Sequence, residues 1–480
     1  MPSLRNSLPQ LSAVFGAALV TKLVFWWLDP VLALHSDSGL YLKDSFSLQP
    51  SWPRPIGYGI FLRVLTELLG EVRIGAVSLA QTLIGAALAT GTFAISRRYL
   101  RAPLWAAALG AALVTLSPGN LLLERYLLSD ALALAVLGLC VALLLAYLQR
   151  PGLLRGALLG LAAVLPLVLR ASWSLLPLVF LAMALFAFYR PTESPTADPF
   201  ERRDLRRRAL IGLIAALAVG FLSTVAYSGV FSRTTLGEVD LAAGTSGFAG
   251  WTLWASVGRF AEPGDLDGIP GGEILLSDRE SLQRNGSYQI WDFDSTAHRL
   301  RKEFHDGSMV KTNQTLERAA VRVALRHPLS FTGQFLTALK RFFLPTQGNN
   351  DYSSALTVDD SVDKFFMQLI GLDIETLDRT PGLTGVLYRP WRYSRWFFSS
   401  LLLAGFGWAV LRPRRRLAVL AVATVGVSYL LVVNLAVGFV FVERYYLPVE
   451  YLATLVLVGL LAAPGSRRRG ELAQMVDRRR

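Results

Sequence analysis

The chain has 480 residues, of which 53% are hydrophobic and 17% charged, and its mean hydropathy is +0.42. Soluble chains carry about 25% charged residues, so this composition excludes an ordinary soluble protein and predicts an all-α polytopic membrane protein. The net charge of +13 does not indicate a nucleic-acid partner, because the arginines lie in short links between apolar runs, the pattern that orients membrane proteins. The one cysteine, Cys140, excludes an intrachain disulfide and a CxxC site.

About ten apolar runs approach the length of about 20 residues that a transmembrane helix needs. In chain order they begin at Leu8, Arg73, Ala102, Leu128, Leu153, Ser172, Ala209, Trp396, Leu417 and Tyr446. No cleavable signal peptide is evident, so the first run is expected to stay as an anchor. The runs within 153–189 are interpreted as a tight hairpin of two short spans with Arg170 in its turn.

The links after every second span are rich in arginine, and the most basic of them covers residues 202–208. The excess of Lys and Arg on the cytoplasmic side then predicts a multi-pass membrane protein with both termini cytoplasmic. The high content of Arg, Ala and Leu indicates a GC-rich bacterium, and hence the bacterial inner (plasma) membrane. The division of the chain follows from this topology: a transmembrane module over 1–227 with a first outer loop at 30–72, an extracytoplasmic region of α or α+β structure over 228–395, C-terminal spans over 396–464, and a basic cytoplasmic tail over 465–480.

The first outer loop is abruptly polar between His35 and Leu62. It carries two carboxylates, Asp37 and Asp44, and then Trp52 and Arg54, each followed by a proline. A residue before proline is pushed towards extended backbone geometry, so a stiff, non-helical loop is expected there. Tyr58 lies on the glycine-containing return that follows. A plain solvated loop between two helices is the alternative interpretation.

An acid just past the first span, followed by an RP-x-x-Y return, resembles the integral-membrane glycosyltransferases of the GT-C class, and within it the bacterial relatives of protein mannosyltransferases and of the aminoarabinose transferase. Residues Glu443 to Pro448, in the order E-R-Y-x-x-P, resemble a recurring C-terminal motif of that class. The resemblance implies a GT-C-like fold and a polyprenyl-phosphate-linked sugar donor. It also implies that the acid is the catalytic base. One departure is Ser38, which stands where many members carry a second acid.

Two groups of acids are candidates for the chemistry. A carboxylate that takes a proton from the acceptor hydroxyl can accelerate transfer by about 10²–10⁴-fold, and Asp37 is preferred for this role over Asp44. Glu124, Arg125 and Asp130 form a second cluster expected on the same side of the membrane. Asp130 would orient the acceptor or join Asp37 around a divalent cation, and metal dependence stays open. Alternatively, Ser129 is a helix N-cap with Asp130 in the first turn.

Arginine donates two parallel hydrogen bonds to phosphate, so arginines on the outer side are candidates for holding the donor phosphate. They are Arg54, Arg125, Arg170, Arg341 and Arg444. Any of them could instead anchor a helix end in lipid headgroups. Glu124, Trp52, Tyr58 and Tyr445 are candidates for binding the acceptor or the sugar.

Residues 315–343 are expected to form amphipathic helices that are broken at His327-Pro328 and lie in the membrane interface.

Together these features predict a hexosyl or pentosyl transferase. It would move a sugar, with inversion, from the lipid donor to a glycan, lipid or protein acceptor on the outer face of the membrane, where the active site lies. Membrane lipid is the expected surrounding, and no cofactor other than a divalent cation is implied. Two rivals remain, a transporter or flippase of a lipid-linked sugar and a non-enzymatic assembly protein. A flippase would need the arginines but no base.

Overall fold

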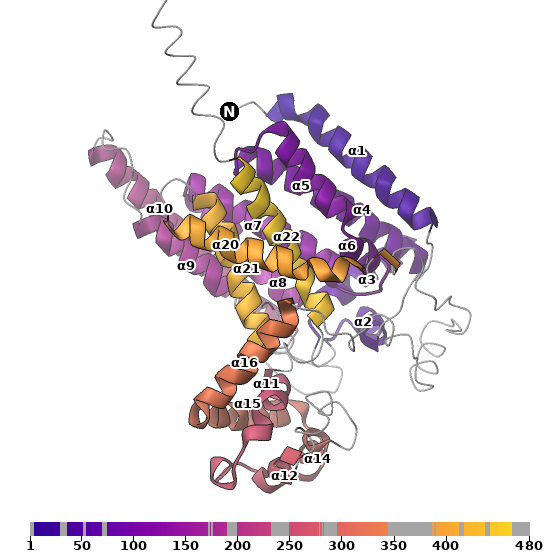
Figure 1. Ribbon diagram of the computed structural model, residues 1–480, viewed down its shortest axis with the longest axis vertical. Coiled ribbons are helices and arrows are strands. Elements are labelled where there is room, and N and C mark those ends of the chain that lie inside the picture. Colours follow the sequence, from indigo (N-terminus) through magenta and orange to yellow (C-terminus); the bar gives the residue numbers. More distant parts are fainter. Residues whose placement is uncertain are drawn as a thin grey trace, which may run out of the picture.

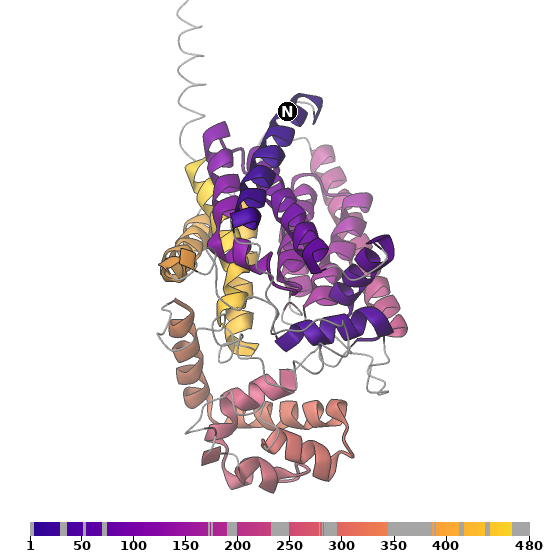
Figure 2. The ribbon, with the colours of Figure 1, turned by 90° about the vertical axis from the view of Figure 1, so that its right-hand side faces the viewer.

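The computed structural model describes residues 4–28, 36–50, 54–69, 74–170, 173, 176–189, 199–231, 249–277, 279–280, 282, 295–343, 386–387, 390–411, 417–436 and 442–462. Within these residues every regular element is a helix and no strand occurs. A bundle of apolar helices forms one part of the molecule, and a smaller group of helices lies at one end of it (Figures 1 and 2).

Each of the ten predicted apolar runs corresponds to a helix. These helices are α1 (Leu4–Leu28), α4 (Ile74–Arg98), α5 (Leu104–Leu116), α7 (Asp130–Gln149), α8 (Leu153–Leu169), α9 (Leu176–Tyr189), α10 (Pro199–Val230), α20 (Arg395–Leu411), α21 (Leu417–Ala436) and α22 (Val442–Leu461). Five segments of the described chain are long and apolar enough to cross a bilayer: Leu8–Leu28, Gly75–Arg98, Asp130–Gln149, Arg203–Val230 and Arg392–Leu411. The other five helices are shorter but apolar. Helix α20 crosses α21 and α22 obliquely and packs on both of them (Figure 1).

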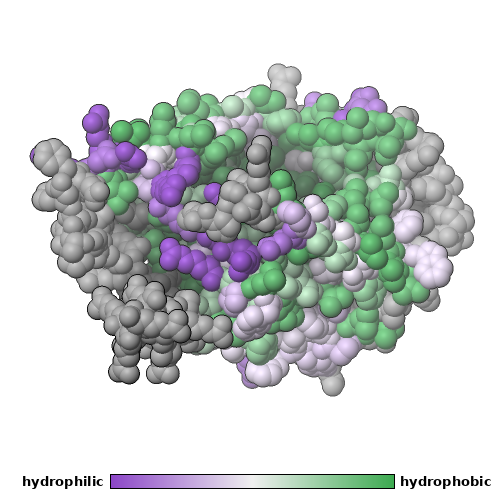
Figure 3. All heavy atoms as spheres, turned by 90° about the horizontal axis from the view of Figure 1, so that it is seen from above, coloured by the Kyte–Doolittle hydropathy of each residue, from purple (hydrophilic) through white to green (hydrophobic). Residues whose placement is uncertain are grey.

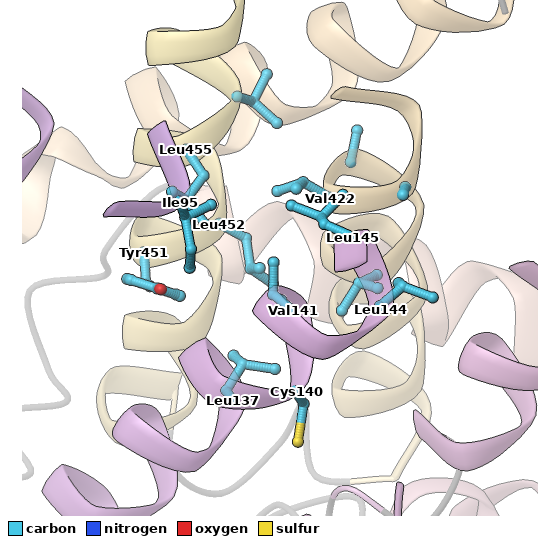
Figure 4. Packing of buried hydrophobic residues seen from close by; sticks show 14 of the residues in the cluster. Ile95, Leu137, Cys140, Val141, Leu144, Leu145, Val422, Tyr451, Leu452 and Leu455 are labelled. Atoms are coloured by element: carbon cyan, nitrogen blue, oxygen red, sulfur yellow. The ribbon is translucent and has the colours of Figure 1, made fainter. Parts of the chain in front are cut away.

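The centre of the bundle is a large apolar cluster that α4, α7, α21 and α22 share. Figure 4 shows α7 contributing Leu137, Val141 and Leu144 between the side chains of α21 and α22. Cys140 is buried there and donates a hydrogen bond to the Ala162 carbonyl oxygen at 3.0 Å, which agrees with the role of a small core residue. Viewed from the end that holds the N-terminus of α1, the surface carries hydrophilic residues near its middle, with hydrophobic residues around them (Figure 3).

Helices α8 and α10 pack in parallel through small residues spaced four apart. Gly152, Gly156 and Gly160 precede or lie on α8, and they face Gly212 and Ala216 of α10. A Cβ atom at Gly156 would collide with the Gly212 carbonyl oxygen, and one at Gly160 with that of Ala216. Such small-xxx-small pairs let membrane helices approach to backbone contact. The pairing puts the basic first turns of α10 at the same end of the bundle as the start of α8.

Replacing Gly156 by leucine is therefore expected to destabilise the bundle by about 1–3 kcal/mol, the usual cost of overpacking, because the obstacle is backbone. Gly91 of α4 is the matched control, since nothing lies within 4 Å of a Cβ atom placed there. Thermal unfolding of the purified variants in detergent measures the difference. Equal melting temperatures for Gly156→Leu and Gly91→Leu would contradict the close packing.

The smaller group of helices has a core of its own. It comprises α11 (Ala249–Val257), the 3₁₀ turns η2 (Gly258–Phe260) and η3 (Pro263–Asp265), α12 (Gly272–Ser277), α14 (Thr296–Phe304) and α15 (Met309–Arg326). Helix α16 (Pro328–Phe343) leads from this group back to the bundle. Trp251 and Trp254 of α11 are buried against Leu316 and Val323 of α15.

The predicted break at His327-Pro328 is confirmed, because α15 ends at Arg326 and α16 begins at Pro328. The interfacial position predicted for the whole of 315–343 is wrong for the apolar face of α15, which packs on α11. A sequence pattern cannot distinguish an apolar helix face that meets lipid from one that meets another helix. The described part of the predicted extracytoplasmic region is helical, without β structure.

Asp265 of η3 forms hydrogen bonds with residues at the break between α15 and α16. Its carboxylate accepts hydrogen bonds from the Glu262 amide at 2.8 Å and the Arg326 guanidinium at 3.1 Å, and it contacts the His327 ring at 2.8 Å. Burial raises the pKa of Asp265, but these hydrogen bonds outweigh it and leave the pKa below its ordinary value of 3.8. A group whose pKa is lowered on folding contributes stability that is present above its unfolded pKa and is lost as the pH falls through the folded one.

This group of helices is accordingly expected to loosen when the pH falls below about 4. Amide hydrogen exchange over residues 309–326 at pH 7 and pH 3 measures the effect. In Asp265→Asn the exchange should already be faster at pH 7 and should change less on acidification. An equal change in the variant and the wild type would show that Asp265 is not responsible.

Candidate functional site

The second acidic cluster lies on a buried turn between α6 (Pro118–Leu123) and the start of α7. The turn is held by neighbouring helices through its carbonyl oxygens. Gln81 of α4 donates to the oxygens of Glu124 at 3.1 Å and Tyr126 at 2.8 Å, and Ser38 donates to that of Leu127 at 2.9 Å. Ser129 and Asp130 end this segment, which we call the acidic turn (residues 124–130). Buried backbone groups need such partners, so the conformation of the acidic turn is specified.

Lys22 of α1 holds the first acid of the turn. Its Nζ lies 2.5 Å from Glu124 Oε1, and the two side chains are 0% and 4% exposed. Gly85 of α4 makes room for the pair, because a Cβ atom there would collide with the Glu124 carboxylate and lie 3.1 Å from Lys22 Nζ. Buried charges are tolerated when they are paired and hydrogen-bonded. Glu124, predicted to contact the acceptor, is therefore placed in an ion pair with almost no exposed surface.

Arg170, at the end of α8, holds the second acid. Its guanidinium forms an ion pair with the Asp130 carboxylate, and both side chains are buried. The Tyr445 ring of α22 lies against the same guanidinium, with its centroid 4.7 Å from Cζ. The structure thus brings three predicted residues from α7, α8 and α22 together. Ser129 occupies the N-cap position of α7 with Asp130 in the first turn, as the alternative interpretation predicted, but its side chain makes no capping hydrogen bond. Its hydroxyl instead lies 3.0 Å from the Tyr41 hydroxyl.

The first outer loop folds as two helices, α2 (Ser36–Ser47) and α3 (Gly57–Leu69), which lie at the end of the bundle near the acidic turn. Asp44 is fully buried between α2 and α3. A Cβ atom placed at Gly59 of α3 would lie 2.8 Å from the Cβ atom of Asp44. Position 37 lies two turns before Asp44 on the same face of α2. Arg54 is half-buried in a non-helical bend between the two helices, as the X-Pro pairs predicted.

Tyr58 is part of the packed interior between α3 and α4. Its side chain is fully buried, and its hydroxyl donates to Gln81 Oε1 at 2.9 Å. Burial raises the pKa of Tyr58 well above its usual value, and the nearby Tyr41 and Asp130 raise it further. Tyr58 therefore stays a neutral donor that orients Gln81, and it has no exposed ring face for the sugar that the sequence predicted it to bind.

Several predicted residues lie outside this description. Trp52 is not among the described residues, and the side chains of Asp37, Arg341 and Arg444 are not described although α2, α16 and α22 contain them. Arg125 is 3% exposed and lies on the acidic turn between the two ion pairs. Among the described side chains no group of three or more His, Cys, Asp or Glu could hold a metal ion.

Sequence reasoning missed a further set of buried polar residues. Glu450 of α22 accepts a hydrogen bond from Trp391 Nε1 at 3.1 Å and one from Ser117, the N-cap residue of α6, and Arg395 lies close by. Lys22 and Gln81 were also missed. The signal for Lys22 and Glu450 was present, since a single charge in an apolar run is costly unless it is paired or functional. The partners of these two charges come from distant parts of the chain and cannot be read from the pattern.

The acidic turn and its contacts supply three buried cations, Lys22, Arg125 and Arg170, against two carboxylates, Glu124 and Asp130. Asp44 of α2 is also buried at this end of the bundle, and these charged groups lie at low dielectric, where electrostatic interactions are stronger than in water. Helix α2 places position 37 at the same end of the bundle. Comparison of the sequence with models of protein families found no match, and comparison with curated proteins found no similar sequence.

Proposed function

We propose that the chain is a glycosyltransferase of the GT-C type, which transfers a sugar from a polyprenyl-phosphate donor to an acceptor at the outer face of the membrane. The observation that carries this proposal is the buried guanidinium of Arg170, held between Asp130 and Tyr445 at the end of the bundle where α2 lies. A planar, buried arginine suits the phosphate of such a donor.

In the proposed reaction the Asp37 carboxylate takes the proton from an acceptor hydroxyl while that oxygen attacks the anomeric carbon. The bond between the anomeric carbon and the phosphate oxygen breaks, and polyprenyl phosphate leaves with the bonding electron pair. The anomeric configuration is inverted because attack and departure occur on opposite faces. The phosphate gains negative charge as the bond breaks, so a guanidinium placed beside it, that of Arg170, stabilises the transition state more than the ground state.

The ten apolar helices are proposed to span the membrane, including the five that are shorter than a full span. Short spans are accommodated by local thinning of the bilayer and by their neighbours. The end of the bundle that carries α2, the acidic turn and α11–α15 would then be extracytoplasmic, and the start of α10 with its arginines cytoplasmic. A donor with a long prenyl tail would enter sideways from the outer leaflet.

The direct test is transfer by the purified protein in detergent. A panel of hexosyl and pentosyl polyprenyl phosphates, labelled in the sugar, would be incubated with membrane extracts as the source of acceptors. We expect release of polyprenyl phosphate and a labelled product from at least one donor. Analysis by mass spectrometry of the lipid-linked sugars that accumulate in cells lacking the protein would select the donor. The absence of turnover with the accumulating donor would contradict the proposal.

A flippase of the same lipid is the second candidate, and one observation favours it. Lys22 and Glu450 are buried charges on apolar helices, and such charges often mark transport pathways in membrane proteins. A flippase would move a labelled lipid across liposomes without forming a new glycosidic bond. Turnover in detergent, where no leaflet separation exists, distinguishes the two functions.

A further inference from the structure

Three leucines near the corner between α15 and α16 are exposed, although other residues of both helices pack on the small helical group or on the bundle. Leu325, Leu329 and Leu336 are 77%, 87% and 55% exposed. We call them the leucine edge. Leu329 and Leu336 are seven residues apart, so they lie on one face of α16. Phe331, on the opposite side of α16, packs on the core of the small helical group, and Leu339 and Phe343, near the end of α16, pack on the bundle.

The charged residues of α15 and α16, which carry this edge, are mostly positive. Residues 309–343 contain six lysines and arginines and one acid, Glu317. Arg318 and Lys340 are exposed, and Arg326 is about half exposed. A helix with exposed leucines and basic neighbours is suited to a surface of apolar chains capped by anionic headgroups.

The position of α16 also indicates contact with a lipid surface. Figures 1 and 2 show it running from the small helical group to the side of the bundle, where its last turns meet α20, α21 and α22. Helix α20, which α16 contacts, exposes large aromatic residues in its first turn, with Trp396 56% and Phe397 43% exposed. The leucine edge is therefore continuous with the surface that the bundle presents to lipid.

We propose that the leucine edge of α16 lies in the headgroup region of the extracytoplasmic leaflet and binds anionic phospholipid. The end of α16 that packs on the bundle lies deeper, so Leu336 is buried in lipid further than Leu329, and Leu325 lies nearest the aqueous phase. This contact holds the small helical group against the membrane. It requires no catalytic activity.

Site-specific labelling of the full chain tests the proposal. Cys140 is the only cysteine, so Cys140→Ala provides a background for Leu336→Cys, Leu329→Cys and Leu325→Cys, each labelled with an environment-sensitive fluorophore. Glu303→Cys on α14 is the matched control, because Glu303 is about half exposed and α14 lies farther from the bundle than α16. The proteins are reconstituted into liposomes with or without anionic phospholipid, and quenching by lipids spin-labelled near the headgroup is recorded.

We expect quenching at position 336 to be at least about twofold stronger than at 303, with 329 and then 325 in between, because an interfacial helix lies about 5–10 Å into the headgroup boundary. Removing the anionic lipid should reduce quenching at 329. Quenching at 336 and 329 equal to that at 303 would overturn the proposal. A blue-shifted emission without lipid quenching would also overturn it, because another part of the chain or a second copy would then cover the edge.

Discussion

Asp37→Asn is expected to lower the rate of sugar transfer by about 10²–10⁴-fold, the usual contribution of a positioned general base. Asparagine keeps the size and hydrogen bonding of the side chain but cannot take the acceptor proton. The loss should therefore appear in kcat at saturating donor, with binding of polyprenyl phosphate unchanged. The measurement is initial-rate transfer of labelled sugar by the purified variant, together with its melting temperature.

Two other acids provide the controls for this result. Asp44→Asn removes the fully buried carboxylate two turns along the same face of α2, and it is expected to lower stability rather than the rate of the folded protein. Asp204→Asn removes an acid that is 55% exposed on the basic first turns of α10, and it should leave both quantities unchanged. Near-wild-type transfer by Asp37→Asn, together with a large loss of transfer in Asp44→Asn, would show that Asp44 and not Asp37 is the general base.

Arg170→Ala is expected to destabilise the folded protein by about 3–5 kcal/mol, because it leaves the Asp130 carboxylate buried without its cation. Asp130→Asn should cost less, since asparagine is neutral and can still accept a hydrogen bond from the guanidinium. The double variant Arg170→Ala/Asp130→Asn should lose less stability than the sum of the losses in the two single variants, because it contains neither buried charge. Thermal unfolding in detergent measures all three variants. Additive losses would show that the pair contributes little.

The same variants separate a structural role for Arg170 from its proposed role in binding phosphate. Lys22→Ala removes the cation of the other buried pair, so it is a matched control for the loss of a buried charge. If Arg170 contacts the donor, Arg170→Ala should weaken the binding of polyprenyl phosphate far more than Lys22→Ala does. Binding can be followed by mass spectrometry of the intact complex. Equal weakening would mean that both residues act only through the fold of the acidic turn.

The sequence alone was sufficient for the positions of the ten apolar helices and for the hairpin at Arg170. Apolar length and the spacing of arginines are properties of local composition, and each run corresponds to a helix. The break before Pro328 was also predictable, because proline disfavours helical geometry in the residue before it. The first outer loop was different. Its X-Pro pairs predicted non-helical backbone at Trp52 and Arg54, and Arg54 does lie in a bend, but the polar pattern did not show that most of the loop forms α2 and α3.

Pairing in space could not be predicted in this way. Nothing in the local pattern shows that Lys22 meets Glu124 across 102 residues, that Asp130 meets Arg170, or that Tyr58 is buried against Gln81. The apolar face of α15 resembles an interfacial helix in sequence, but α11 covers it. Composition and periodicity determined which segments are helical and which are apolar. The partner of each buried charge and apolar face was decided only by the tertiary structure, because burial energy depends on which groups meet and not on where they lie in the chain.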